Sequence, residues 1–326
     1  MLYLMKMQPV FKQYIWGGTG FKDKFGMQTG TDTASEAWMV SANKNGKSII
    51  ANGDFKNKTI DEAYESLKEK LAGDEIYKKY GMHFPLLVKF LDCADKLSVQ
   101  VHPDDKYAMK NENTRFGKTE MWYILDAKEN AKLIYGFNKD VTKQEFEEAI
   151  EKGSLSDILN YVSVKAGDTF YIKSGTLHAL LDGLMVAEIQ QNSDTTYRVY
   201  DYDRKDKNGN KRELHIKKSL DVTSLESSKG KEHVKTSETL DANGNKKTHL
   251  VECECFNTDK YEIKEKAEFS SLESSFDILI FTKGEAKVVC EFNEVSVKAG
   301  DCILVPAYLG KYFVKGNCEL LKSYAK

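Results

Sequence analysis

The sequence predicts a mainly β protein built from two related β-barrels, with small helical insertions. Three observations lead to this fold class: most of the chain reads as short strands, helical periodicity is confined to two places, and one hexapeptide occurs twice. The chain has 326 residues, a length that fits two domains or one large domain with insertions.

Three strand patterns lie between residues 83 and 125. Residues 83–90 form an apolar run of strand length. Residues 96–102 alternate between apolar and polar side chains, which places Gln100 and His102 on one face of a strand. Residues 118–125 predict a further strand. Both polar side chains on the alternating strand could therefore point into a barrel.

Helical patterns begin at two capping boxes. Thr59 is followed three residues later by Glu62, and Thr142 by Glu145, and apolar residues at helical spacing follow each pair. Residues 155–159 are expected to continue the second pattern as another short helix. We interpret both stretches as insertions on a β framework. The predicted helical insertions lie near residues 59–80 and 141–160.

The repeated hexapeptide indicates that the two barrels are related. Ser-Val-Lys-Ala-Gly-Asp stands at residues 163–168 and again at 296–301, an offset of 296 − 163 = 133 residues. Each copy leads into an apolar strand, and Gly-Asp permits a tight turn between strands. The same offset relates His178 to Lys311, so only the first copy keeps an imidazole. This asymmetry suggests an active barrel and a supporting one.

A polar segment separates the predicted domains. Residues 224–248 are rich in Ser, Lys, Glu, Thr and Asn and read as a connection. Asn-Gly pairs at 208–209 and 243–244 are typical of hairpin turns. We expect an active domain over residues 1–235 and a supporting C-terminal domain over residues 236–326.

The composition is that of a globular protein with nearly balanced charge. Hydrophobic residues make up 41 %, and 48 Lys and Arg stand against 50 Asp and Glu, for a formal net charge of −2. A chain of this kind buries a core and has no basic excess, which argues against disorder and against a nucleic-acid partner. With only six histidines and four arginines, a site that needs imidazole or guanidinium draws on few residues.

The expected compartment is the cytoplasm, with no membrane partner. No apolar run approaches the ~18 residues of a membrane span, and the N-terminal segment is charged too soon for a signal peptide. The six cysteines include no Cys-x-x-Cys pair and read as reduced thiols. Cys253 and Cys255 alternate on one strand face and could bind a metal, but a structural role is favoured because no ligand pair accompanies them.

A candidate metal site combines side chains from three strands. His102, Glu120 and His178 would supply two imidazoles and a carboxylate, a set that leaves an open position for substrate or water. The spacing of these residues also fits purely structural roles. In that case His102 lies in a turn before Pro103 and His178 is a hydrogen-bonded core histidine.

Several blocks of the sequence, in order, resemble the type I mannose-6-phosphate isomerases of the short bacterial form. The resemblance is dense over the first two thirds of the chain and thinner over the last third. The blocks are residues 84–92, 97–105, 117–123, 174–179 and 188–201, with a looser match at 35–41.

This resemblance implies a zinc-dependent aldose–ketose isomerase on a cupin framework, acting on a hexose 6-phosphate. It implies one Zn²⁺ per chain, and a second cupin domain without a metal agrees with Lys311. The implied zinc ligands are Gln100, His102, Glu120 and His178, and the implied catalytic residues are Lys118 and Arg198.

Chemical considerations limit the roles of the two implied catalytic residues. A guanidinium does not act as a base at neutral pH, so Arg198 suits stabilisation of an oxygen anion or a phosphate. Lys118 could act as a base only if its pKa were lowered, and would otherwise hold phosphate. Two alternatives stay open: a sugar-phosphate-binding cupin without catalysis, and an Fe(II)-dependent cupin oxygenase, since two imidazoles and a carboxylate also bind Fe(II).

Overall fold

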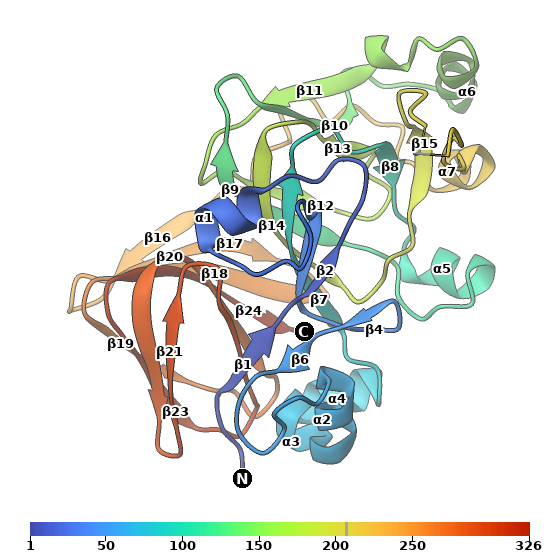
Figure 1. Cartoon of the computed structure of the whole chain (residues 1–326). Coiled ribbons are helices and arrows are strands. Elements are labelled where there is room, and N and C mark those ends of the chain that lie inside the picture. Colours follow the sequence, from blue (N-terminus) through green and yellow to red (C-terminus); the bar gives the residue numbers. More distant parts are fainter. Residues whose placement is uncertain (206–207) are drawn as a thin grey trace.

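The computed structural model describes residues 1–205 and 208–326, and strands dominate it (Figure 1). A six-stranded and a five-stranded sheet come from the first two thirds of the chain, and an eleven-stranded sheet comes largely from the last third. The predicted mainly β fold class is confirmed, although no sheet closes into a complete barrel in the described residues. Among those residues, no helix combines the length and the apolar character that crossing a membrane requires.

The six-stranded and five-stranded sheets share an apolar core. Trp122 and Phe170 from the first sheet and Leu133 and Leu180 from the second are buried in it together. The six-stranded sheet has the order β12 (Thr169–Ile172), β9 (Glu120–Ala127), β14 (Leu184–Gln191), β7 (Leu86–Cys93), β3 (Glu36–Val40) and β2 (Val10–Lys12). The five-stranded sheet has the order β11 (Leu159–Ser163), β10 (Lys132–Phe137), β13 (His178–Leu180), β8 (Val99–Val101) and β15 (Tyr197–Tyr200). A small separate sheet pairs β4 (Ala42–Asn43) with β5 (Gly46–Lys47).

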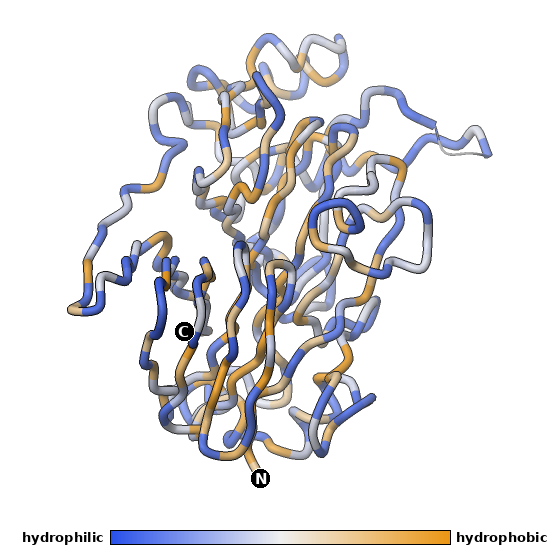
Figure 2. Tube along the Cα trace, turned by 60° about the vertical axis from the view of Figure 1, so that its left-hand side comes forward, coloured by the Kyte–Doolittle hydropathy of each residue, from blue (hydrophilic) through white to orange (hydrophobic). Residues whose placement is uncertain are grey.

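The eleven-stranded sheet includes a strand from the start of the chain. Strand β1 (Met5–Gln8) pairs with β22 (Cys302–Val305), so that Met5 lies opposite Leu304. The main order is β16 (Ser237–Leu240), β17 (Lys246–Glu252), β18 (Phe256–Ile263), β24 (Cys318–Ala325), β20 (Asp277–Cys290), β22, β1 and β6 (Ile49–Ile50). Strands β19 (Lys266–Ser270), β21 (Glu294–Lys298) and β23 (Lys311–Lys315) complete it. Apolar residues follow these strands, whereas many outer loops are hydrophilic (Figure 2).

Helices lie at the margins of the sheets. Both predicted capping boxes are present, at Thr59 with Glu62 and at Thr142 with Glu145. Residues 155–159 do not form a second helix: Leu155–Asp157 makes one 3₁₀ turn, and Leu159 already pairs with Phe137 in β10. The helices are α1 (Gly20–Phe25), α2 (Ile60–Leu67), α3 (Glu69–Ala72), α4 (Asp74–Tyr80), α5 (Asp105–Asn111), α6 (Lys143–Glu151) and α7 (Ile216–Val222).

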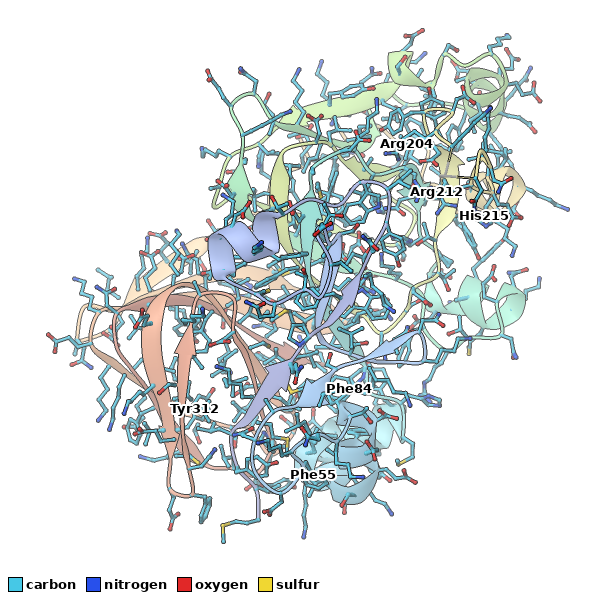
Figure 3. The ribbon with its side chains drawn as sticks, in the orientation of Figure 1. Phe55, Phe84, Arg204, Arg212, His215 and Tyr312 are labelled. Atoms are coloured by element: carbon cyan, nitrogen blue, oxygen red, sulfur yellow. The ribbon has the colours of Figure 1, made fainter. Side chains whose placement is uncertain are left out.

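Two of these helical regions cover separate parts of the core. The α2–α4 segment packs on a cluster that contains Phe84, labelled in Figure 3. Phe84 stacks on Phe276 of the last third of the chain, with ring centroids 4.8 Å apart. Helix α6 covers the five-stranded sheet, where Phe146 meets Phe137 edge-on. The apolar residues of β8, Val99 and Val101, face this second cluster. Gln100, between them, therefore points toward the six-stranded sheet, as the alternation predicts.

The two hexapeptides form the same turn. In each copy the Lys N–H donates to the Asp Oδ2 at 2.9 Å, for Lys165 and Asp168 as for Lys298 and Asp301. The glycine adopts a φ of 92° in one copy and 94° in the other, a left-handed conformation that glycine tolerates. Each turn leads from one strand to the next, β11 to β12 and β21 to β22. The internal repeat is therefore a structural repeat.

Candidate metal centre and active site

The candidate ligands come from both sheets of the first two thirds of the chain. His178 begins β13 and lies opposite Gln100 of β8, and His102 follows β8 directly. Glu120 begins β9 in the six-stranded sheet. The predicted set therefore converges at one end of the two sheets, where the strands that carry it begin or end.

Three of these side chains lie close enough to share one metal ion. The ligand atoms of His102, Glu120 and His178 all lie within 4.8 Å of one another. Glu120 Oε1 is 3.3 Å from His178 Nε2, and Glu120 Oε2 is 3.7 Å from His102 Nε2. Ligand atoms in a tetrahedral zinc site, with bonds of about 2.0–2.2 Å, lie roughly 3.3 Å apart. The three side chains thus have the spacing of a metal-binding triad.

Backbone carbonyls orient both imidazoles toward the centre of the triad. His102 Nδ1 lies 2.9 Å from the Thr195 carbonyl oxygen, and His178 Nδ1 lies 2.8 Å from that of Thr176. Each Nδ1 therefore carries the proton, which leaves the Nε2 lone pair directed at the site. This second-sphere arrangement is typical of histidines that bind a metal through Nε2.

The triad is buried and incompletely hydrogen-bonded. Glu120 Oε1 and His178 Nε2 are buried atoms without a hydrogen bond to any described residue. Burial lowers the pKa of His178 to about 4. Burial and, to a smaller extent, the charge of Lys118 lower the pKa of His102 well below its usual value. Neutral imidazoles and a buried carboxylate with an unsatisfied oxygen are what a divalent cation binds, so these residues fit a metal.

Lys118 provides the cation that faces the triad in this structure. Its Nζ lies 2.8 Å from Glu120 Oε2 and 2.9 Å from His102 Nε2. Burial and, to a smaller extent, the charge of Glu188 raise the pKa of Glu120 to about 7, even though Lys118 lowers it. The predicted catalytic lysine is therefore in direct contact with two of the predicted ligands.

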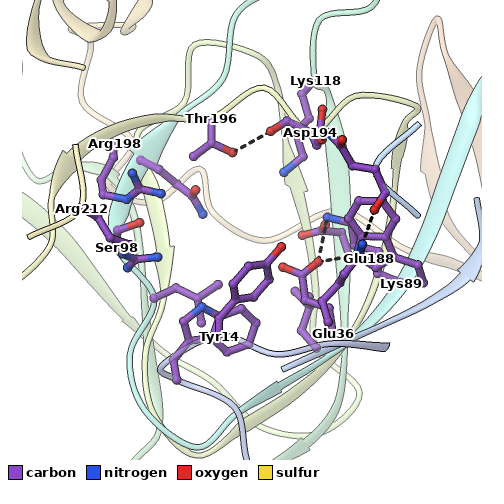
Figure 4. Close-up of a pocket in the computed structure, with 17 residues that line it drawn as sticks. Tyr14, Glu36, Lys89, Ser98, Lys118, Glu188, Asp194, Thr196, Arg198 and Arg212 are labelled. Carbon is purple, nitrogen blue, oxygen red and sulfur yellow. Dashed lines mark hydrogen bonds and ion pairs between the residues drawn. The ribbon is translucent and has the colours of Figure 1, made fainter. Parts of the chain in front are cut away.

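A cavity of 430 Å³ opens beside the triad (Figure 4). Gln100 and Lys118 line it, whereas the three triad residues lie behind them, each 1 % exposed or less. Arg198 and Arg212 stand on one side of the cavity, and Tyr14 points into it. The structure thus brings all six predicted site residues to one place: three in the triad and three on the wall of the cavity.

The opposite wall carries a buried ion-pair network that sequence reasoning missed. Lys89 Nζ lies 3.4 Å from Glu36 Oε2 and 3.5 Å from Glu188 Oε1 (Figure 4). Burial alone would lower the pKa of Lys89, but Glu36 and Glu188 outweigh it and hold the pKa above its usual value. A lysine within an apolar strand is the signal that could have revealed the network, because a buried ammonium needs partners.

Arg212 was also missed, and Asp201 holds it in place. Arg204 and Arg212, both labelled in Figure 3, make ion pairs with Asp201. Burial alone would raise the pKa of Asp201, but hydrogen bonds from Arg212 and Arg204 outweigh it and hold the pKa below its usual value. Arg198 donates to the Glu213 carbonyl at 2.9 Å, while its buried Nε has no hydrogen bond to a described residue.

Comparisons with known proteins agree with this site. Residues 4–129 match the family described as phosphomannose isomerase type I, catalytic domain, and residues 246–325 match the mannose-6-phosphate isomerase cupin domain. The chain is 39 % identical to the probable mannose-6-phosphate isomerase GmuF of Bacillus subtilis, over 99 % of this chain and all of the relative.

Two further relatives show the same full-length likeness. The mannose-6-phosphate isomerase ManA of Bacillus subtilis is 40 % identical, over 97 % of each chain. The crystal structure of the mannose 6-phosphate isomerase from Bacillus subtilis superposes with a TM-score of 0.90, at 39 % identity, over 98 % of this chain and 99 % of that one. On this likeness in sequence and fold, the chain belongs to the type I mannose-6-phosphate isomerase family.

Proposed function

We propose that this enzyme interconverts mannose 6-phosphate and fructose 6-phosphate. The observation that carries the proposal is the His102–Glu120–His178 triad, which lies behind a cavity lined by lysine and arginine side chains. An aldose–ketose isomerase needs a site that stabilises negative charge on two adjacent sugar oxygens, and basic groups around the cavity suit a phosphorylated substrate. Membership of the isomerase family supports the same assignment.

We propose zinc as the metal, with His102, Glu120 and His178 as ligands and Gln100 as a fourth. Two neutral imidazoles and a carboxylate form a ligand set that zinc accepts, and Gln100 lies opposite His178 on the neighbouring strand. When bound, the metal would polarise the sugar carbonyl and offset the charge of the enediolate. A neutral amide as fourth ligand adds no negative charge, in contrast to a second carboxylate.

The proposed catalytic residues are Lys118 and Arg198. Isomerisation moves a proton between C2 and C1 of the open-chain sugar. Lys118 lines the cavity and contacts His102 and Glu120, so its Nζ is positioned to hold or move a proton beside the ligands. Arg198 stays charged and has a buried Nε without a hydrogen bond to the described residues, which suits it to an anionic oxygen of the substrate.

We also propose that residues 1–235 carry catalysis and that residues 236–326 form a metal-free supporting domain. Lys311, the counterpart of His178, is exposed and pairs with Glu268. The pairing of β1 with β22 attaches the first residues of the chain to the supporting sheet. All six cysteines are free thiols, which is consistent with the proposed cytoplasmic location.

A coupled assay for fructose 6-phosphate, run beside elemental analysis of the same protein, tests the function. We expect turnover with about one zinc per chain, and loss of both in Glu120→Gln, which retains the shape of the side chain but removes its charge. His83→Ala, at an exposed histidine outside the cavity, is the matched control. Sugar-phosphate binding without turnover in zinc-loaded protein would indicate a binding cupin, and oxygen uptake with iron would indicate an oxygenase; either result would refute the isomerase.

A further inference from the structure

A second cavity, of 720 Å³, lies between the first two thirds of the chain and the hairpin that joins β17 to β18. It shares no lining residue with the active-site cavity. Its wall includes five carboxylates, two lysines, the Tyr171 hydroxyl and the thiols of Cys253 and Cys255. The proposed isomerase reaction uses none of these groups.

The hairpin holds the two thiols on either side of Glu254. The Cys253 N–H donates to the Phe256 carbonyl at 3.0 Å, which closes the turn. The Cys255 carbonyl accepts from the Lys326 N–H at 3.1 Å, so the turn is also fixed to the C-terminus marked in Figure 1. Both cysteines are partly exposed, whereas the other four cysteines are buried. These two thiols are therefore the ones that a solute in the solvent can reach.

The two thiols differ in their ionisation. Hydrogen bonds from the Cys255 thiol and backbone, from Phe256 and from the Tyr171 side chain outweigh burial and lower the pKa of Cys253 to about 6. The Cys253 thiol and burial raise the pKa of Cys255. Asp105, Lys79, Tyr80 and Lys326 are further charged or titratable groups that act on this pair. The protonated Cys253 thiol donates to the Phe256 carbonyl at 3.4 Å, and its pKa lies below that of Cys255, so Cys253 is the thiol that ionises first as pH rises.

The surrounding carboxylates do not complete a metal site with the thiols. Within residues 1–205 and 208–326, the only three His, Cys, Asp or Glu side chains close enough together to hold one ion are His102, Glu120 and His178. A reactive thiolate beside a second thiol is instead the arrangement of a redox-sensitive pair. Residues two apart in sequence are separated by at most about 7 Å, so a compact turn brings their Cα atoms within the range of a disulfide.

We propose that Cys253 and Cys255 form a peroxide-sensitive dithiol, in which Cys253 is oxidised first and Cys255 then closes a disulfide. The Cys253 thiolate attacks one oxygen of hydrogen peroxide, and the O–O bond breaks. Hydroxide departs as the leaving group, and Cys253 becomes a sulfenic acid. The Cys255 sulfur then attacks the Cys253 sulfur, the S–O bond breaks, and the hydroxyl leaves with the Cys255 proton as water. Two thiols and one peroxide thus give one disulfide and two waters, counting the proton released from Cys253.

The test uses the full-length protein treated with a small excess of hydrogen peroxide and analysed by peptide mass spectrometry. We expect the peptide that contains both cysteines to lose two hydrogen atoms, and dithiothreitol to restore them. Cys255→Ser should stop at a sulfenic acid on Cys253 that dimedone traps. Cys253→Ser should slow peroxide-dependent thiol loss by about tenfold or more, while Cys290→Ser, at a buried thiol, should leave the rate unchanged.

Three results would overturn the proposal. One is thiol loss in Cys253→Ser at the rate of the unmodified protein. Another is oxidation that falls mainly on the buried cysteines. The third is a disulfide between two chains in place of one within the hairpin. None of these readouts depends on turnover of a sugar phosphate, so failure of the dithiol and failure of the proposed isomerase function are separate outcomes.

Discussion

Asp277 of β20 occupies the position that Glu120 occupies in β9. Glu120 pairs with Ile172 and Asp277 pairs with Val305, and 305 − 172 gives the same offset of 133 residues as the repeated hexapeptide. Both carboxylates are fully buried. Glu120 faces two imidazoles and the Lys118 ammonium, whereas Asp277 faces the Lys322 ammonium at 2.6 Å and the Tyr312 hydroxyl at 2.9 Å. Each copy thus has a lysine beside the buried carboxylate, and the two imidazoles belong to the first copy.

Lys322→Met should therefore destabilise the protein strongly. The substitution leaves the buried Asp277 with the Tyr312 hydroxyl, 2.9 Å from its Oδ2, as its remaining polar partner among those described. Removing one member of a buried ion pair typically costs about 3–5 kcal/mol of unfolding free energy. Urea denaturation followed by circular dichroism measures the change.

A matched control and a double variant make the Lys322 result specific. Lys311→Met breaks an exposed pair with Glu268 and should cost less than about 1 kcal/mol. Adding Asp277→Asn to Lys322→Met removes the unpaired charge and should restore part of the loss. Equal losses in the Lys311 and Lys322 single variants would refute the argument.

The fold class and the repeat could be predicted from the sequence because their signals are local. Alternation along β8, the two capping boxes and the repeated turn each lie within a few consecutive residues. The pairing of β1 with β22 could not be predicted, since nothing in Met5–Gln8 specifies a partner almost 300 residues away. The apolar spacing of Leu159 fits a helix as well as a strand, and its pairing with Phe137 places it in β11.

The candidate site was predictable only in part, for a similar reason. His102, Glu120 and His178 are residue types with few roles when buried, so their chemistry marks them out. Lysine is a common residue type, so Lys89 does not stand out in the sequence. Its role depends on Glu36 and Glu188, which reach it from two other strands. Arg212 likewise reaches the cavity through a contact with Asp201 that no sequence pattern encodes.

Lys118→Met should strengthen metal binding while it abolishes turnover. The Lys118 ammonium contacts two of the proposed ligands, so it opposes a divalent cation at the same place. Removing this repulsion should raise zinc affinity by about tenfold or more. Competition with a chromogenic chelator measures the affinity without reference to activity.

Lys12→Met is the control for the Lys118 variant. Lys12 also lines the cavity, but its ammonium lies over the Trp38 ring and donates to the Asn45 carbonyl. Its zinc affinity should match that of the unmodified protein. A lower affinity in Lys118→Met would show that the ammonium supports the ligand set instead of competing with the metal.

Glu62→Gln should reduce stability at neutral pH and lose its effect in acid. A hydrogen bond from the Thr59 backbone N–H and, to a smaller extent, one from Lys58 lower the pKa of Glu62 to about 2. The pKa of a glutamate in an unfolded chain is ~4.3. A lowered carboxylate pKa stabilises the fold above pH ~4.3, and this contribution disappears as pH falls toward 2. The difference between the two proteins in unfolding free energy should therefore shrink between about pH 5 and pH 2. Glu65→Gln, in the same helix but outside the capping box, should show no such trend, and a constant difference for Glu62→Gln would contradict the assignment.

Asp201→Asn should raise KM for the sugar phosphate more than it lowers kcat. Asp201 holds Arg212 at the cavity wall through an ion pair, and Arg212 is suited to the phosphate because a guanidinium binds it bidentately. Loosening that arginine should weaken substrate binding by about tenfold and leave the proton-transfer residues in place. Inorganic phosphate should inhibit the variant more weakly than the unmodified enzyme. Asp203→Asn breaks an exposed pair with Lys211 and should change neither constant. A fall in kcat at unchanged KM would instead place the Asp201 cluster in the chemical step.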